Sequence, residues 1–150
     1  MLPVASSSSE VSIRINNAAD VARAQRVARE LARTIGFEIS AQWQLATAVS
    51  EAATNMLKFA QGGLVTLVAI NDPALGMEFQ AMDDGPGFSD VTLALRDGVS
   101  EGRERYAAED IRRFRGLGLG LGAIQRLTDE LWIGNRPGGG ALVRARKYLR

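Results

Sequence analysis

The sequence contains no cysteine and no histidine. These absences exclude a disulfide framework, a thiol nucleophile, a zinc site built from Cys or His ligands, and a Ser-His-Asp relay. Any chemistry must therefore use carboxylates, hydroxyls, amides, Lys or Arg side chains, backbone N–H groups, or a bound cofactor. The 18 basic and 17 acidic side chains nearly cancel. The formal net charge of +1 gives no electrostatic reason to expect nucleic acid or an acidic membrane as the main partner.

The sequence also lacks any apolar stretch near the roughly 20 residues that a membrane-spanning helix needs. Its first ten residues lack the basic region of a signal peptide. We therefore expect a cytoplasmic protein with no membrane segment. Residues 1–10, which include four consecutive serines, are predicted to be a mobile tail. Residues 11–150 have the length and the composition, 46% hydrophobic and 23% charged over the chain, of a single globular domain.

Hydrophobic periodicity predicts the order β-α-α-β-β-loop-α-β-β. Gly36 is the expected C-cap of the first helix and Ser40 the expected N-cap of the second. This order predicts an α/β (α+β) two-layer sandwich, in which an open mixed β-sheet carries helices on one face. The expected strands are 11–15, 64–70, 77–82, 130–133 and 141–148, and the expected helices are 18–35, 40–60 and 121–128.

One face of the second predicted helix carries three polar residues of different chemistry. Glu51, Asn55 and Lys58 are spaced i, i+4 and i+7, so they lie within about 60° of arc on a helix. A carboxylate can orient or deprotonate an attacking hydroxyl, an amide oxygen can ligate Mg²⁺, and an ammonium can contact phosphate. An ordinary solvated helix face would show the same pattern, so this motif alone leaves both interpretations open.

An acidic and glycine-rich segment, Asp83-Asp84-Gly85-Pro86-Gly87, follows a predicted strand. An aspartate at a strand end can accept a hydrogen bond from an exocyclic amine. Glycines at this place would let the backbone approach a flat ring. The alternative is a plain surface turn, because Asp-Gly and Gly-Pro are common turn dipeptides.

Glycine is the one abundant special residue, and 12 of the 16 glycines lie between Gly85 and Gly140. Four of them alternate with leucine from Gly116 to Gly122. A flexible linker would alternate glycine with serine, because exposed leucines are unfavourable. We interpret the segment as a phosphate loop whose N–H groups face phosphates at the start of the next helix. It matches neither G-x-x-x-x-G-K-[ST] nor G-x-G-x-x-G, which indicates a phosphate loop of another type.

The order of the three motifs resembles that of the GHKL (Bergerat-fold) ATPases: E-x-x-x-N-x-x-K on a helix, D-x-G-x-G after a hairpin, then a loop and G-L-G-L-G-L. The resemblance covers nearly the whole chain from about Val11. Within the family, the sequence is most similar to the stressosome switch serine/threonine kinases and the related anti-sigma-factor kinases. The segments that carry this similarity are AADVARAQRVARELARTIGF, ATAVSEAATNMLKFA, DDGPGFSDVTLALRDGVS and GLGLGLGAIQRLTDEL.

The resemblance implies a Bergerat ATP-binding fold that uses ATP and Mg²⁺. It implies that Glu51 is the catalytic base or hydroxyl-orienting group, that Asn55 ligates Mg²⁺ and that Asp83 binds the adenine amine. The other implied nucleotide contacts are Gly85 and Gly87 at the adenine, and Lys58, Gly116, Gly118, Gly120 and Leu121 at or near the phosphates.

Three positions depart from the family pattern. The expected lid, about residues 88–116, is long, because Gly102–Gly116 exceeds the short lid of the switch kinases. Ala141 follows Gly140 where the family often has threonine, which removes a hydroxyl that would support the adenine-binding aspartate. Phe59 stands where many relatives carry histidine.

We therefore expect residues 11–150 to form an ATP-dependent serine/threonine kinase of the partner-switching type. Its substrate would be a STAS-domain antagonist or scaffold protein, with a sigma factor or a PP2C-type phosphatase as further candidate partners. A histidine kinase of this family needs a phosphoacceptor histidine, and this sequence has none. We therefore expect the pocket either to phosphorylate a hydroxyl of another protein or only to bind ATP. One alternative is a non-enzymatic ATP-binding switch that sequesters a sigma factor or activates a phosphatase. Another alternative is a nucleic-acid-binding module. It would use the basic residues of the last strand, which are more simply explained as a solvated sheet edge: Arg144, Arg146, Lys147 and Arg150.

Overall fold

The computed structural model of the chain describes residues 10–87 and 121–150. In these ranges the order of helices and strands is the predicted one. The expected lid and nearly all of the predicted tail lie outside the described residues. The elements, in chain order, are β1 (Val11–Ile15), α2 (Ala18–Ile35), α3 (Ile39–Ala60), β2 (Gly63–Asn71), β3 (Leu75–Asp83), α6 (Leu121–Leu127), β4 (Glu130–Asn135) and β5 (Ala141–Tyr148).

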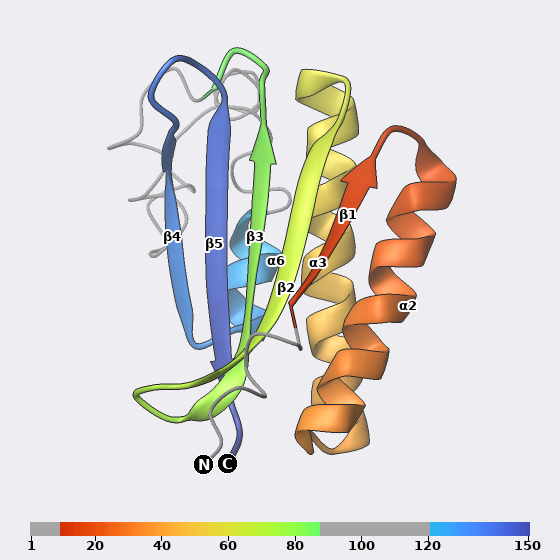
Figure 1. Cartoon of the computed structure of the whole chain (residues 1–150), viewed down its shortest axis with the longest axis vertical. Helices are drawn as coiled ribbons and strands as arrows, with labels where there is room; N and C mark the ends of the chain where they lie inside the picture. Colours follow the sequence, from red (N-terminus) through yellow and green to blue (C-terminus); the bar gives the residue numbers. More distant parts are fainter. Residues whose placement is uncertain (1–9, 88–120) are drawn as a thin grey trace.

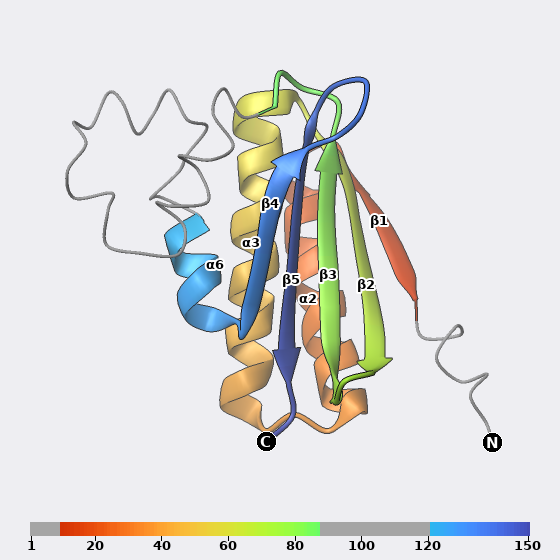
Figure 2. The same ribbon diagram turned by 90° about the vertical axis from the view of Figure 1, so that its left-hand side faces the viewer.

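The described residues form the predicted two-layer sandwich, with α2, α3 and α6 on one face of a single sheet (Figures 1 and 2). The strand order is β1-β2-β3-β5-β4. The prediction of a mixed sheet is wrong for these strands, because every neighbouring pair is antiparallel. Two helices connect β1 to β2, so the chain re-enters the sheet in the opposite direction. The parallel strands β3 and β4 are not neighbours, because β5 lies between them.

The first long helix has the ends that its sequence predicts. At its start, the side chain of Asn17 accepts a hydrogen bond from the backbone N–H of Asp20 at 3.0 Å, which satisfies one of the free donors of the first turn. At its end, Gly36 has φ of +118°, a left-handed conformation that glycine adopts without steric cost. The predicted C-cap is confirmed.

The second long helix begins at Ile39, one residue before the predicted range 40–60, and its capping residue is not the predicted one. Its N-cap is Glu38 rather than Ser40, and Glu38 makes no side-chain cap bond. The buried side chain of Phe37 holds the chain against the core at this point. Gln42 then donates its backbone N–H to the carbonyl of Glu38 and its side-chain amide to the carbonyl of Phe37. Tertiary packing therefore overrides the local capping preference of Ser40.

Alternate strand residues face the helices, as the period of two in a strand requires. The apolar residues on the side of α3 opposite its polar face, which their helical spacing predicts to face the sheet, are buried, except that Ala60 is only partly buried: Leu45, Val49, Ala53 and Met56. None of the helices in 10–87 and 121–150 has the length and apolar character needed to cross a membrane. The largest fully buried side chains are Phe79, Ile13, Ile15, Leu45, Met56, Leu67, Met77, Leu121, Ile124, Val49 and Val65.

The basic last strand is an interior strand, so the expectation of a solvated edge is wrong. β5 pairs with β3 on one side and with β4 on the other (Figure 1). Arg146 donates from Nε to the buried carboxylate of Glu78 at 2.8 Å, and this hydrogen bond raises the pKa of the guanidinium above its ordinary value. The guanidinium of Arg144 stacks over Trp132 at 4.4 Å from the ring centroid. These two arginines thus have partners within the protein.

Candidate functional site

Three predicted site residues from distant parts of the chain line one small cavity between α3 and the sheet. They are Asn55 in α3, Asp83 at the end of β3 and Leu121 at the start of α6. The volume of the cavity is about 10 Å³, which is room for one water molecule but not for an aromatic ring. The remaining lining residues are apolar: Ala52, Met56, Ala81, Ala141 and Val143.

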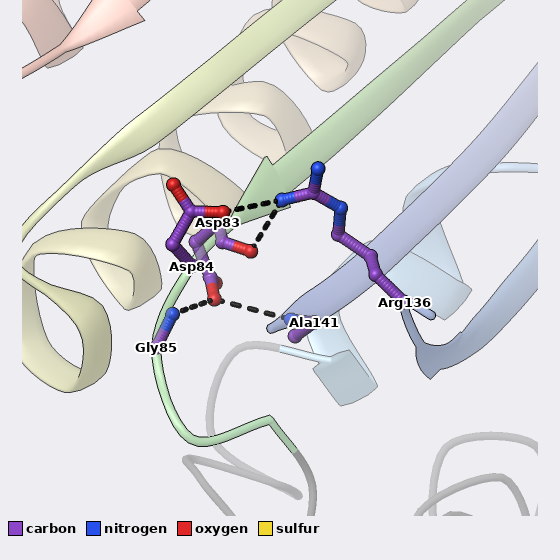
Figure 3. Close-up of polar contacts among 5 residues, drawn as sticks. All are labelled: Asp83, Asp84, Gly85, Arg136 and Ala141. Carbon is purple, nitrogen blue, oxygen red and sulfur yellow. Dashed lines mark hydrogen bonds and ion pairs between the residues drawn. The ribbon is translucent and has the colours of Figure 1, made fainter. Parts of the chain in front are cut away.

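The carboxylate of Asp83 is held by two backbone donors. Asp83 is only 3% exposed, and a buried carboxylate needs hydrogen bonds to offset its loss of contact with water. Oδ1 accepts from the N–H of Gly85 at 3.0 Å and from the N–H of Ala141 at 3.1 Å (Figure 3). The backbone of Ala141 therefore supports Asp83 directly, although its side chain lacks the hydroxyl that the family often has there.

A third support of this segment is one that the sequence interpretation missed. Nη1 of Arg136 donates to the main-chain oxygen of Asp83 at 2.7 Å and to Oδ1 of Asp84 at 2.9 Å (Figure 3). Arg136 begins the turn between β4 and β5, which the sequence indicates only as a glycine-rich turn. An arginine beside such a turn is common, so no signal in the sequence marks it as part of the site.

Both glycines of the acidic segment are required by packing inside the protein. A Cβ at Gly85 would lie 2.5 Å from the Cβ of Ala60, at the end of α3. Gly87 has φ of +77°, and a Cβ there would lie 2.6 Å from Oδ1 of Asn135. The contact at Gly85 and the left-handed conformation of Gly87 explain why the segment needs glycine. The predicted role of both residues beside a flat ring stays a prediction.

The predicted polar face of α3 is present, and its last residue is the most exposed. Glu51 and Asn55 are half-buried and Lys58 is exposed. Asn55 lines the cavity, and Glu51 precedes it by one helical turn, about 6 Å along the axis. Neither Glu51 nor Lys58 lines the cavity. Of the three residues of this face, only Asn55 lines the cavity, and Glu51 lies on the same helix face one turn before it.

The donors near the cavity suit a metal ion only in combination with a ligand. Across residues 10–87 and 121–150, no group of three or more acidic side chains is placed to hold a metal ion. Mg²⁺ typically uses one or two protein oxygens together with substrate phosphates and water. The amide oxygen of Asn55 fits that mode of binding. The predicted phosphate-loop residues Gly116, Gly118 and Gly120 lie outside the described residues.

Replacing Gly140 by alanine should destabilise the protein by about 3 kcal/mol, because a Cβ adds steric overlap to a left-handed conformation. Gly140 has φ of +96°, and its Cβ would lie 1.8 Å from the main-chain oxygen of Asp83. Gly138 is the matched control, because it has φ of +88° but no atom within 4 Å of the added Cβ. Gly138→Ala should cost only about 1 kcal/mol. Urea unfolding measures both, and equal losses would contradict the packing explanation.

Known proteins and one protein family match this chain over most of its length. The family model "Histidine kinase-like ATPase domain" matches residues 15–147. The serine/threonine-protein kinase RsbT of Bacillus subtilis (strain 168) is 31% identical over 139 residues, 92% of this chain and 96% of the relative. An anti-sigma F factor of Caldanaerobacter subterraneus subsp. tengcongensis is 31% identical over 105 residues, 69% of this chain and 67% of the relative. A chain of the SiaB-SiaC complex of Pseudomonas aeruginosa has the same fold, with a TM-score of 0.63 at 15% identity, over 91% of this chain and 88% of that one.

Proposed function

This chain belongs to the histidine kinase-like ATPase family, the GHKL ATPases, and on that premise we propose that it is an ATP-dependent protein serine/threonine kinase of the partner-switching type. One observation carries the proposal. Asn55, Asp83 and Leu121, which the resemblance to the GHKL ATPases implies as nucleotide contacts, lie around one cavity. The similarity to a serine/threonine kinase over nearly the full length of both chains supports phosphoryl transfer as the reaction.

In this proposal the adenine amine donates to the carboxylate of Asp83. The two backbone N–H groups on Oδ1 keep that carboxylate in one orientation, so little reorganisation is needed when the base binds. Gly85 and Gly87 would border the base. The phosphates would lie near Lys58 and against the backbone of the glycine–leucine loop: Gly116, Gly118, Gly120 and Leu121.

Catalysis would be mainly positioning and charge stabilisation, as in other phosphoryl transfers. The Glu51 carboxylate orients the incoming serine or threonine hydroxyl and accepts its proton. The hydroxyl oxygen forms a bond to the γ-phosphorus as the bond to the β–γ bridging oxygen breaks, which leaves ADP. Asn55 would hold Mg²⁺ through its amide oxygen, and the ion would neutralise phosphate charge when bound.

The proposed substrate is a STAS-domain antagonist or scaffold protein, as in stressosome and sigma-factor switching. Phosphorylation of one hydroxyl would add about −1.5 to −2 charge to its surface and so change which partner it binds. The similarity to anti-sigma F factors supports a sigma factor as a second kind of partner, and a PP2C-type phosphatase is a third. We place this reaction in the cytoplasm, and we assign it to residues 11–150 as one domain.

A transfer assay tests this function. The protein is incubated with γ-labelled ATP, Mg²⁺ and each STAS-domain protein from the same genome. We expect acid-stable label on a serine or threonine of one of them, and no label on a partner whose acceptor is replaced by alanine. If ATP binds but no partner is labelled, the kinase proposal is wrong and the non-enzymatic ATP-binding switch is the better description.

A further inference from the structure

The turn between β4 and β5 holds Asp83 from two sides. Nη1 of Arg136, at the start of the turn, donates to the main-chain oxygen of Asp83 at 2.7 Å. The N–H of Ala141, just after the turn, donates to the Asp83 side chain at 3.1 Å. The position of the main chain and the orientation of the carboxylate therefore both depend on residues that flank one turn, as Figure 3 shows.

This turn is itself closed by hydrogen bonds. The N–H of Arg136 donates to the carbonyl of Gly140 at 2.8 Å, and the N–H of Gly139 donates to the carbonyl of Arg136 at 3.0 Å. Gly140 packs so tightly on Asp83 that no side chain fits between them. A movement of the turn would therefore move Asp83 as well, because the two are in direct contact.

The two acceptors of the Arg136 guanidinium differ in their surroundings. The side chain of Asp84 is 94% exposed, and an ion pair at such a place contributes little because water screens it. The other acceptor is the main-chain oxygen of Asp83, a residue that is 3% exposed. The bond to this oxygen is partly buried, so water screens it less than it screens the ion pair to the exposed Asp84. The main-chain contact is therefore the important one.

We propose that Arg136 is a positioning residue of the nucleotide site, which holds Asp83 where its carboxylate meets the base. This inference rests on the proposed function, in which Asp83 binds the adenine amine. Arg136 acts through the main chain of Asp83 and does not touch the reacting phosphates. Its loss should therefore weaken ATP binding and leave the chemical step unchanged.

Three variants of the full chain test this role: Arg136→Ala, Arg136→Lys and Asp84→Asn. We expect Arg136→Ala to raise both the KM for ATP and the Kd for a non-hydrolysable ATP analogue about 10-fold, with kcat within about twofold of the parent. Arg136→Lys should recover part of the affinity, because an ammonium can still donate to the carbonyl. Asp84→Asn should bind ATP like the parent, because it removes only the exposed ion pair. Calorimetry gives Kd, the transfer assay gives KM and kcat, and thermal unfolding monitors the fold.

The outcomes separate this inference from the function on which it rests. If Arg136→Ala binds the analogue like the parent while Asp83→Asn does not bind it, the site stands and the role of Arg136 is wrong. If Asp83→Asn also binds normally, the nucleotide site itself is wrong. Should Arg136→Ala fail to fold, the other two variants decide. Equal weakening by Arg136→Lys and Asp84→Asn would assign the effect to the ion pair and overturn the main-chain role.

Discussion

Glu51→Gln is expected to lower the rate of phosphoryl transfer by about 10²- to 10⁴-fold, with ATP affinity within about twofold of the parent. Glutamine keeps the shape of the side chain but cannot accept the proton of the incoming hydroxyl. Glu51 does not line the cavity that Asn55, Asp83 and Leu121 line. The adenine of ATP should therefore bind to the variant as it does to the parent. Initial transfer rates at saturating ATP and partner, together with calorimetry, measure the two effects separately.

A matched control for this variant is Glu30→Gln. Glu30 is an exposed residue of α2, and the same change of charge there should leave the transfer rate unaltered. Unreduced transfer by Glu51→Gln would remove the catalytic role of Glu51. Loss of ATP binding together with transfer would instead place Glu51 in the nucleotide contacts and contradict its role as a base.

Asp83→Asn should weaken ATP binding by about 100-fold, because the adenine amine loses a charged acceptor inside the protein. The amide oxygen of asparagine can still accept from the N–H groups of Gly85 and Ala141, which keeps the local backbone supported. The loss should therefore appear in affinity rather than in folding. Calorimetry with a non-hydrolysable ATP analogue and thermal unfolding without nucleotide measure the two quantities.

Two comparisons sharpen this test. Asp84→Asn makes the same chemical change at the next residue, where the side chain is 94% exposed, and it should bind ATP like the parent. Inosine triphosphate carries a carbonyl in place of the exocyclic amine, so the parent protein should prefer ATP and Asp83→Asn should lose that preference. Equal binding of both nucleotides by the parent would show that Asp83 does not recognise the amine.

Local patterns account for most of the fold. The bounds of α2 and β5 and the buried side of α3 follow from residue spacing, because periodicity decides which side chains can share an apolar face. The predicted N-cap of α3 was wrong, because the buried side chain of Phe37 and the hydrogen bonds from Gln42 outweigh the capping preference of Ser40. The prediction of a mixed sheet was also wrong. Which strands are neighbours depends on where β5 enters the sheet, and no local sequence pattern contains that information.

The sequence by itself determined the available chemistry. The absence of cysteine and histidine left carboxylates, amides and backbone groups, and the spacing of Glu51 and Asn55 placed two of them on one helix face. Tertiary structure alone decided how Asp83 is held. Its partners Arg136 and Ala141 are 53 and 58 residues away in sequence, and Ala141 contributes a backbone N–H, a group that nearly every residue has. Such a donor has no signature in sequence, so only the pairing of β3 with β5 could reveal it.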